Sequence, residues 1–213
     1  MSKEAIFDQN FEYYDKWFDE HYKIYEIELN AIKKLLPPFK DGLEVGVGTG
    51  RFAAPLGIKY GIEPSKNMAK IAKKRGIKVI NAVAENLPFE DKSFDLILIV
   101  TTICFVKDPL KMLKESYRVL KDNGKIIIAF VDKNSELGKF YEKNRDKSKF
   151  YKEATFFSKK EVFSLLKRSG FVLEACNESL FGPDLEHLEL KTTQGCKKGG
   201  AFLVLRARKK EFK

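Results

Sequence analysis

A glycine-rich stretch that follows an apolar segment limits most strongly what this chain can fold into. Residues 41–51 read Asp-Gly-Leu-Glu-Val-Gly-Val-Gly-Thr-Gly-Arg, so that Gly46, Gly48 and Gly50 stand at alternate positions. Glycine adopts positive φ readily and leaves no Cβ between the main chain and a ligand. The pattern therefore predicts a strand that ends in a sharp turn against a flat cofactor.

Two acidic residues indicate which kind of cofactor this turn holds. Glu44 lies inside the predicted strand, where a carboxylate would repel a pyrophosphate but attract an ammonium group. Glu63 follows a second predicted strand, residues 58–62. A carboxylate at the end of that strand can accept hydrogen bonds from both hydroxyls of a ribose. The two acids together favour a nucleotide that carries an amino acid over a dinucleotide.

Four segments, in this order and spacing, resemble the class I S-adenosylmethionine-dependent methyltransferases. They are Glu-x-Gly-x-Gly-x-Gly at 44–50, Gly-Ile-Glu-Pro-Ser at 61–65, Ala-Glu-Asn-Leu-Pro-Phe at 84–89 with Ser-Phe-Asp at 93–95, and Tyr-Arg-Val-Leu-Lys-Asp-Asn-Gly-Lys at 117–125. The resemblance covers residues 40–131. It implies an α/β fold: a three-layer Rossmann-like sandwich with about seven mostly parallel strands, an antiparallel edge strand and an N-terminal helical cap.

The resemblance also implies S-adenosylmethionine as cofactor and a small molecule as methyl acceptor. The expected cofactor-binding residues are Glu44, Gly46, Gly48, Gly50, Glu63, Met68, Ala84, Glu85, Leu87 and Thr101. In the family, the loop equivalent to the one at Ala84 lies along the adenine. Val83 stands where the family often has Asp, so we expect a less polar pocket for the base.

The pattern along the chain predicts a single domain, residues 1–213. Residues 1–38 would form a helical cap, with one helix broken once, because apolar residues recur there every three or four positions and two prolines follow. Residues 39–131 would form the cofactor-binding core. Residues 132–213 would cover the substrate and add two closing strands, at 171–175 and 200–207, joined by a flexible connection at 184–199.

The substrate and the catalytic groups are less well specified. Tyr14-Asp-x-Trp17-Phe resembles segments that lie over the substrate in small-molecule methyltransferases, so we expect Tyr14, Trp17 and Phe105 at the acceptor. The only candidates for a general base are Tyr14, Asp132 and His187. After the strand at 94–100 the chain has neither the His nor the Asn-Pro-Pro-Tyr sequence of family members that methylate amide or base nitrogens.

Composition excludes several classes. With 213 residues, no apolar run near the roughly 18 residues of a membrane span, and a polar N-terminus, we expect a soluble cytoplasmic protein. Cys104, Cys176 and Cys196 are far apart and odd in number, which predicts ordinary thiols with neither a disulfide framework nor a metal site. The acceptor atom and the oligomeric state stay open.

Two other functions deserve comparison. Gly48-x-Gly50-x-x-Ala53 satisfies the fingerprint of an NAD-dependent oxidoreductase, but Glu44 beside the phosphate position and Pro55 in the following helix argue against it. The net charge of +10 would suit a basic RNA-binding or RNA-modifying protein. Because the lysines are interleaved with glutamates along every segment, a heavily solvated surface is favoured over nucleic-acid binding.

Overall fold

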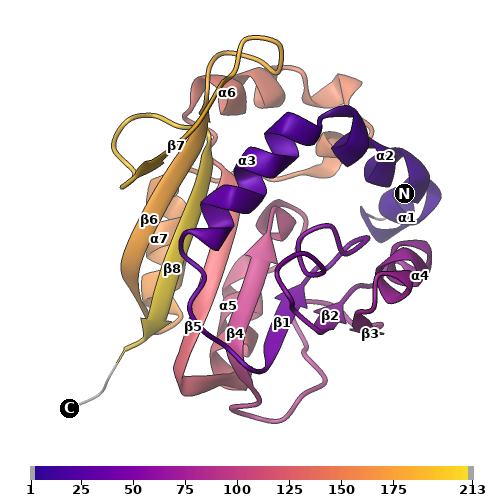
Figure 1. Cartoon of the computed structure of the whole chain (residues 1–213), viewed down its shortest axis with the longest axis vertical. Helices are drawn as coiled ribbons and strands as arrows, with labels where there is room; N and C mark the ends of the chain where they lie inside the picture. The colour runs from indigo at the N-terminus through magenta and orange to yellow at the C-terminus, as the bar shows by residue number, and fades with distance from the viewer. Residues whose placement is uncertain (1–2, 211–213) are drawn as a thin grey trace.

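The computed structural model describes residues 3–210, which are built around one eight-stranded sheet (Figure 1). The strands are β1 Gly42–Val45, β2 Tyr60–Ile62, β3 Lys78–Ile80, β4 Phe94–Val100, β5 Leu120–Val131, β6 Phe171–Phe181, β7 Glu189–Gln194 and β8 Phe202–Lys209. Their order is β3-β2-β1-β4-β5-β8-β6-β7. Strands β1 to β5 pair in parallel, whereas β8 runs antiparallel to both β5 and β6.

Helices cover both faces of this sheet. They are α1 Lys3–Gln9, α2 Phe11–Glu20, α3 Tyr22–Lys33, α4 Lys66–Lys74, α5 Pro109–Val119, α6 Glu136–Lys143 and α7 Lys159–Arg168. Short 3-10 turns stand at Thr102–Cys104, Arg145–Lys147 and Tyr151–Glu153. Side chains cap two of these helices: Ser65 accepts the Met68 N–H at the start of α4, and Ser158 forms a capping box with Glu161 at α7.

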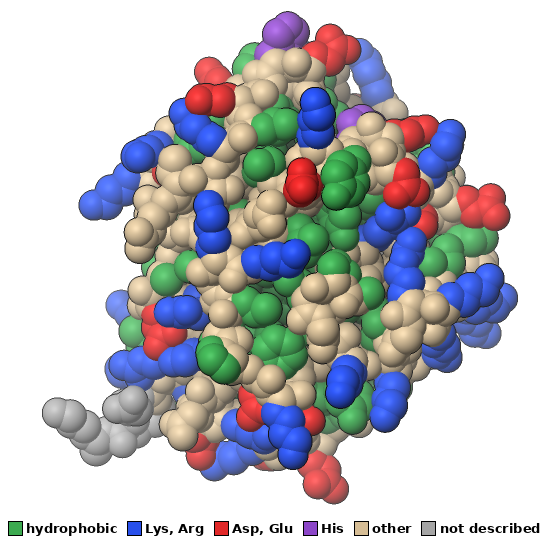
Figure 2. All heavy atoms as spheres, viewed as in Figure 1, with side chains coloured by type: hydrophobic (Ala, Val, Ile, Leu, Met, Phe, Trp, Pro, Cys, Tyr) green, Lys and Arg blue, Asp and Glu red, His purple; other side chains and the backbone are tan. Residues whose placement is uncertain are grey.

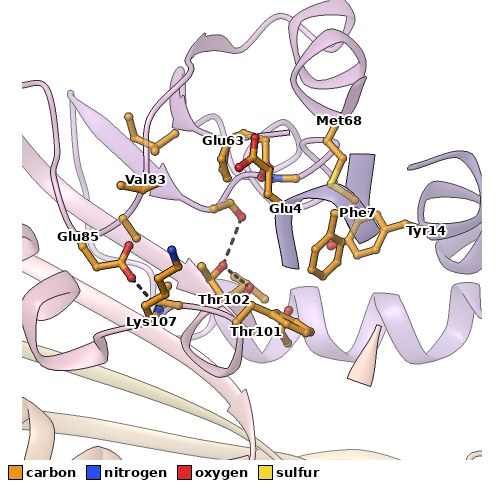
Figure 3. A pocket seen from close by; sticks show the side chains of 18 residues that line it. Glu4, Phe7, Tyr14, Glu63, Met68, Val83, Glu85, Thr101, Thr102 and Lys107 are labelled. Carbon is orange, nitrogen blue, oxygen red and sulfur yellow. Dashed lines mark hydrogen bonds between the residues drawn. The ribbon is translucent and has the colours of Figure 1, made fainter. Parts of the chain in front are cut away.

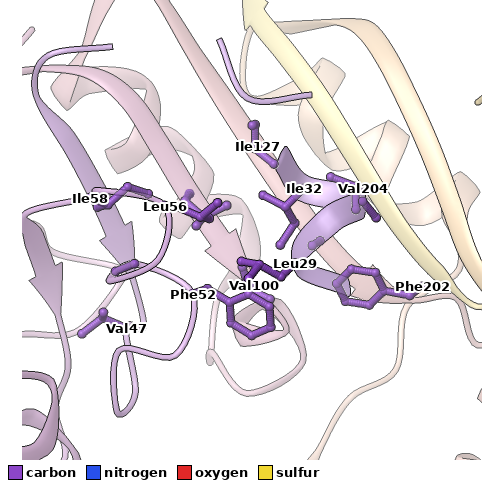
Figure 4. Packing of buried hydrophobic residues seen from close by; sticks show 14 of the residues in the cluster. Leu29, Ile32, Val47, Phe52, Leu56, Ile58, Val100, Ile127, Phe202 and Val204 are labelled. Atoms are coloured by element: carbon purple, nitrogen blue, oxygen red, sulfur yellow. The ribbon is translucent and has the colours of Figure 1, made fainter. Parts of the chain in front are cut away.

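Two apolar clusters, one on each face, hold the layers together. On one face Ile32 of α3 packs with Val100 of β4 and Phe202 of β8 (Figure 4). On the other face Ile97 and Ile99 of β4 pack with residues of α5 and α7. Because successive side chains of a strand point to opposite faces, β4 contributes to both clusters and its sequence is almost continuously apolar. The predicted three-layer α/β sandwich is confirmed.

Several local expectations were wrong. The N-terminal segment forms three helices, not one helix broken once. Residues 184–199 are not simply a flexible connection: they contain β7, which pairs antiparallel with β6 at the sheet edge and raises the strand number to eight. Its sequence is polar because main-chain hydrogen bonds, and not buried side chains, hold an edge strand of this kind.

The expectation of three ordinary thiols is also corrected. Cys176 on β6 and Cys196, which directly follows β7 and its turn, are joined as a disulfide, with 5.8 Å between their Cα atoms. That separation is normal for a bridged pair. The pairing depends on the β6–β7 hairpin, which the sequence pattern did not reveal.

Ionic contacts fasten the N-terminal helices to the loops of the sheet. The Asp15 carboxylate on α2 accepts hydrogen bonds from Arg51, which follows the glycine turn, and from Arg75 at the end of α4. Burial alone would raise the pKa of Asp15, but the hydrogen bonds from Arg75 and Arg51 outweigh it and hold this pKa well below its ordinary value. We call these three residues the Asp15 clasp.

Charged side chains of both signs lie on the surface of the molecule (Figure 2). Lys and Arg side chains are scattered over the face seen in Figure 2 and alternate with acids, without a single basic stripe. Within residues 3–210, every helix is too short or too polar to cross a lipid bilayer. The division at 1–38, 39–131 and 132–213 stays a prediction, and its first two and last three residues lie outside the described part.

Candidate functional site

The carboxyl ends of β1, β2 and β4 meet at one edge of the sheet, and a cavity of about 410 Å³ opens there (Figure 3). Gly46 and Gly48 follow β1, Glu63 follows β2, and Thr101 follows β4. Helices α1 and α2 close the cavity from the other side with Phe7 and Tyr14 (Figure 3). In open α/β sheets this edge is where ligands bind.

Glu63 is the buried acid of this cavity. One carboxylate oxygen accepts the Gly48 N–H and the other accepts the Ser65 N–H, both at 2.9 Å. Burial raises the pKa of Glu63 to about 7, and Glu4 and Asp8 on α1 add to the rise, whereas the two backbone hydrogen bonds oppose it. Both oxygens keep acceptor capacity for a ligand, because a carboxylate oxygen has two lone pairs.

The glycine turn approaches the opposite loop closely. Gly46 has a φ of 74°, and a Cβ on it would lie 2.4 Å from the side chain of Thr102. The Thr102 hydroxyl in turn donates to the Val100 carbonyl oxygen at 3.1 Å. Only glycine fits this position, so the main chain of the turn is exposed directly to the cavity.

Thr101 stands where β4 gives way to the loop, with a φ of 52°. A β-branched residue seldom adopts this left-handed conformation, which costs of order 1–3 kcal/mol and concentrates at functional sites. The surrounding structure holds it, since its N–H donates to the Ala129 carbonyl oxygen at 2.8 Å. Thr101 is thereby turned toward the cavity.

The part of the cavity farther along β2 is lined by Met68, Val83 and Ala84, which are apolar, and by Glu85. The Glu85 carboxylate accepts the N–H of Lys107 at 2.7 Å and also that of Asp108. Few side-chain hydrogen-bonding groups are therefore left for an adenine. A less polar pocket of this kind is what the valine at position 83 led us to expect.

Seven of the ten predicted cofactor residues line the cavity: Gly46, Gly48, Glu63, Met68, Ala84, Glu85 and Thr101. Gly50 does not, because its missing Cβ faces Ile77 and Ala72. Leu87 also does not, since it is buried in the core and its N–H donates to Glu115.

Glu44 lies below the glycine turn and is not part of the cavity wall. Its side chain is buried, and its Oε2 has no hydrogen-bond partner among the described residues. Burial raises the pKa of Glu44 far above its usual value, although the Ala53 N–H opposes the rise and Glu63 adds to it. An unsatisfied buried carboxylate oxygen is rare and marks a place where a cation or water is expected.

A second cavity of about 420 Å³ adjoins the first. Four residues line both cavities: Phe7, Tyr14, Thr101 and Phe105. Trp17 lines the second cavity but not the first. The three residues expected at the acceptor, Tyr14, Trp17 and Phe105, are therefore brought together here.

The other two candidates for a general base lie elsewhere. Asp132 accepts N–H groups from Asn134 and Lys159 and lines neither cavity. His187 is on an exposed loop, where its ring pairs with Asp184 at 2.7 Å. That pairing raises the pKa of His187 and ties it to its own loop.

Several lining residues were not among the expected site residues: Glu4, Phe7, Glu28, Tyr141, Phe150 and Tyr151. The last three lie in residues 132–213, the segment that was expected to cover the substrate. A signal existed for Glu28. It occupies an apolar position of the helical repeat, between Ile24 and Ile32, where a charged residue breaks the pattern. The described residues contain no cluster of three or more His, Cys, Asp or Glu side chains able to hold a metal ion.

The different surroundings of Gly46 and Gly50 lead to a testable contrast. Gly50→Ala is expected to lower the free energy of unfolding by about 1–3 kcal/mol, because the φ of Gly50 is 86° and the new methyl group would meet Ile77. Its Kd for S-adenosylhomocysteine should stay within about threefold of the wild-type value. Gly46→Ala should lower both stability and affinity. Urea denaturation and calorimetry measure the two quantities; an equal loss of affinity in both variants would place Gly50 at the ligand after all.

The structure thus has a cavity at the ligand-binding edge of a Rossmann-like sheet and a second cavity beside it, and comparison with known proteins identifies the family. Residues 43–128 match the family model described as a methyltransferase domain. The chain belongs to the class I S-adenosylmethionine-dependent methyltransferases.

Two relatives match almost the whole chain, and a third matches part of it. A crystal structure from Thermotoga maritima, described as a SAM-dependent methyltransferase and possible histamine N-methyltransferase, is 48% identical with a TM-score of 0.92; the match covers 97% of this chain and 99% of that one. An uncharacterized protein of Methanocaldococcus jannaschii is 49% identical over 96% of this chain and 98% of its own. A demethylmenaquinone methyltransferase from Geobacillus is 29% identical over 57% of this chain and 59% of its own.

Proposed function

We propose that this enzyme binds S-adenosylmethionine in the first cavity and methylates a small organic molecule held in the second. The observation that carries the proposal is the junction of the two cavities at Phe7, Tyr14, Thr101 and Phe105. A cavity of about 420 Å³ suits one small molecule and is too small for a folded macromolecular segment. The NAD-dependent and RNA-binding alternatives are not favoured by the family assignment.

The residues present fit the cofactor. The Glu63 carboxylate is positioned to accept the ribose hydroxyls, and the bare main chain at Gly46 would contact the methionine portion. Met68, Val83 and Ala84 would pack on the adenine. Because burial raises the pKa of Glu44, its carboxyl group would attract the ammonium group of the cofactor only when binding favours the ionised form, and it would do so without lining the cavity.

When bound, the cofactor would supply a methyl group on a sulfonium sulfur: the lone pair of the acceptor attacks the methyl carbon, and the electrons of the carbon–sulfur bond stay on the sulfur. The task of the chain is placement and exclusion of water, which can lower such a barrier by up to about 7–11 kcal/mol. Phe7 and Phe105 form apolar walls at the junction, and Thr101 fixes the end of β4 there. These side chains would align the two reactants.

Tyr14 is suited to donate a hydrogen bond and not to remove a proton. Burial raises its pKa, and the nearby acids Glu44, Glu63 and Glu28 raise it further. Its hydroxyl therefore stays protonated across the physiological range. A proton lost by the acceptor would leave to solvent, which suits an acceptor that is nucleophilic when neutral.

The cofactor assignment is tested by titrating the protein with S-adenosylhomocysteine in a calorimeter at pH 6 and pH 8. Because Glu63 has a pKa of about 7 in the free protein and accepts hydrogen bonds best when ionised, binding should release a proton, and affinity should rise roughly five- to tenfold between these pH values. Glu4 and Asp8 on α1, Glu44 on β1 and Glu85 are the other acids near the cavity. Repeating the titration in buffers of different ionisation enthalpy counts the protons.

Absence of binding at millimolar ligand would remove the proposed function. Binding that is tight but independent of pH would retain the cofactor and refute the ionisation of Glu63.

A further inference from the structure

The second cavity has a composition that restricts what it can bind. Aromatic side chains supply eleven of its twenty-one lining residues. Several rings contact one another: Phe7 stacks on Phe150 with centroids 4.9 Å apart, and Tyr141 meets Tyr151 at 5.0 Å. Aromatic faces carry negative electrostatic potential and attract cations, most strongly where water is excluded.

One acid, Glu28 on α3, lies in this aromatic wall. Its side chain is 8% exposed, and it forms no hydrogen bond or ion pair with any residue from 3 to 210. No other acid lines the cavity, and the two cations that do, Lys147 and Lys149, are exposed. The Lys149 ammonium lies 4.3 Å from the centre of the Tyr13 ring. The chain itself therefore provides no counter-charge for Glu28.

An unpartnered buried carboxylate destabilises a fold unless something neutralises it. Glu28, Tyr141 and Tyr151 line the same cavity. Burial raises the pKa of Glu28 to about 8 in the free chain, and burial also raises the pKa values of the two tyrosines, with a smaller contribution from Glu28. A group of this kind within a ligand cavity is expected to meet its partner on the ligand.

We propose that the acceptor is an organic amine, whose cationic nitrogen pairs with Glu28 inside the aromatic wall. This inference rests on the proposed function, since it concerns the acceptor of the same reaction. Glu28 lines the second cavity and not the first, whereas Tyr14 and Thr101 line both. The cation bound by Glu28 therefore lies away from the transferred methyl group, and the nucleophilic atom is at the other end of the acceptor. Glu28 is a positioning residue that sets specificity.

The test compares pairs of compounds that differ only in charge. Tyramine with tyrosol, tryptamine with tryptophol, and histamine with histaminol each contrast an amine with the corresponding alcohol. They are titrated calorimetrically into protein saturated with S-adenosylhomocysteine. At least one amine is expected to bind at least about tenfold more tightly than its alcohol, because a buried ion pair forms only with the amine.

Glu28→Gln keeps the size of the side chain and removes its charge, so it should reduce the preference for that amine to within about twofold while the Kd of S-adenosylhomocysteine is unchanged. Glu26→Gln changes an exposed acid on the same helix and should keep the preference. The proposal is overturned if no amine is preferred by protein that binds S-adenosylhomocysteine, or if the preference survives in Glu28→Gln. Failure to bind S-adenosylhomocysteine, in contrast, refutes the proposed function itself.

Discussion

Replacing Glu63 with alanine is expected to raise the Kd of S-adenosylhomocysteine by at least about 100-fold, because each hydrogen bond to a charged group contributes on the order of 1.5–3 kcal/mol and the ribose offers two. The carboxylate is held in place in the free protein by the backbone N–H groups of Gly48 and Ser65. It is therefore oriented before the ligand arrives, and little binding energy is lost in ordering it. No other acid lies at the end of β2 to replace it.

Calorimetry of the purified variant measures this effect, and Glu90→Ala, which removes an exposed acid of the loop after β3, is the matched control. The thermal midpoint of the ligand-free variant shows whether the glycine turn has been disturbed. Removing this buried acid relieves a desolvation cost but leaves the Gly48 and Ser65 N–H groups without their acceptor, so some loss of stability is expected. Unchanged affinity in Glu63→Ala would mean that the ribose is bound elsewhere.

Glu28→Gln is expected to stabilise the ligand-free protein at alkaline pH, by on the order of 5 kcal/mol at pH 9. Burial raises the pKa of Glu28 from 4.5 to about 8 in the folded chain. Below pH 4.5 the Glu28 carboxyl group is mostly neutral in the folded and the unfolded chain, so it does not lower the free energy of unfolding. As the pH rises toward 8 the unfolded chain releases its proton first, so the wild-type protein loses stability that the amide variant keeps.

Urea denaturation of both proteins at pH 5 and pH 9 measures the change in stability, with Glu26→Gln as control. The difference between wild type and Glu28→Gln should grow with pH, and the control should show none. A constant difference would indicate that Glu28 does not titrate in this range. Combined with the loss of amine preference, a gain in stability would distinguish a binding residue from one needed for folding.

The sequence was most informative where function depends on short segments. Gly46, Glu63 and Thr101 line one cavity because each directly follows a strand, and the ends of parallel strands meet at one edge. Gly50 and Leu87 belong to the same segments but face the core. Spacing along the chain does not distinguish a side chain that points to a ligand from one that packs inside.

The second cavity was the least predictable part. Phe7, Glu28 and Phe150 come from α1, α3 and the loop after α6, and nothing in their local sequence places them side by side. The same holds for β7 and the Cys176–Cys196 bridge, which depend on a polar edge pairing. Such contacts are set by tertiary packing, to which local patterns are only weakly related.

The Asp15 clasp has a consequence for the catalytic cycle. Tyr14 is the immediate neighbour of Asp15, and with Phe7 it separates the cofactor from the acceptor compartment. Because the same α2 helix carries Tyr14 and is bound through Asp15 to the residue that follows the glycine turn, breaking these ionic contacts is expected to displace a wall that the two cavities share.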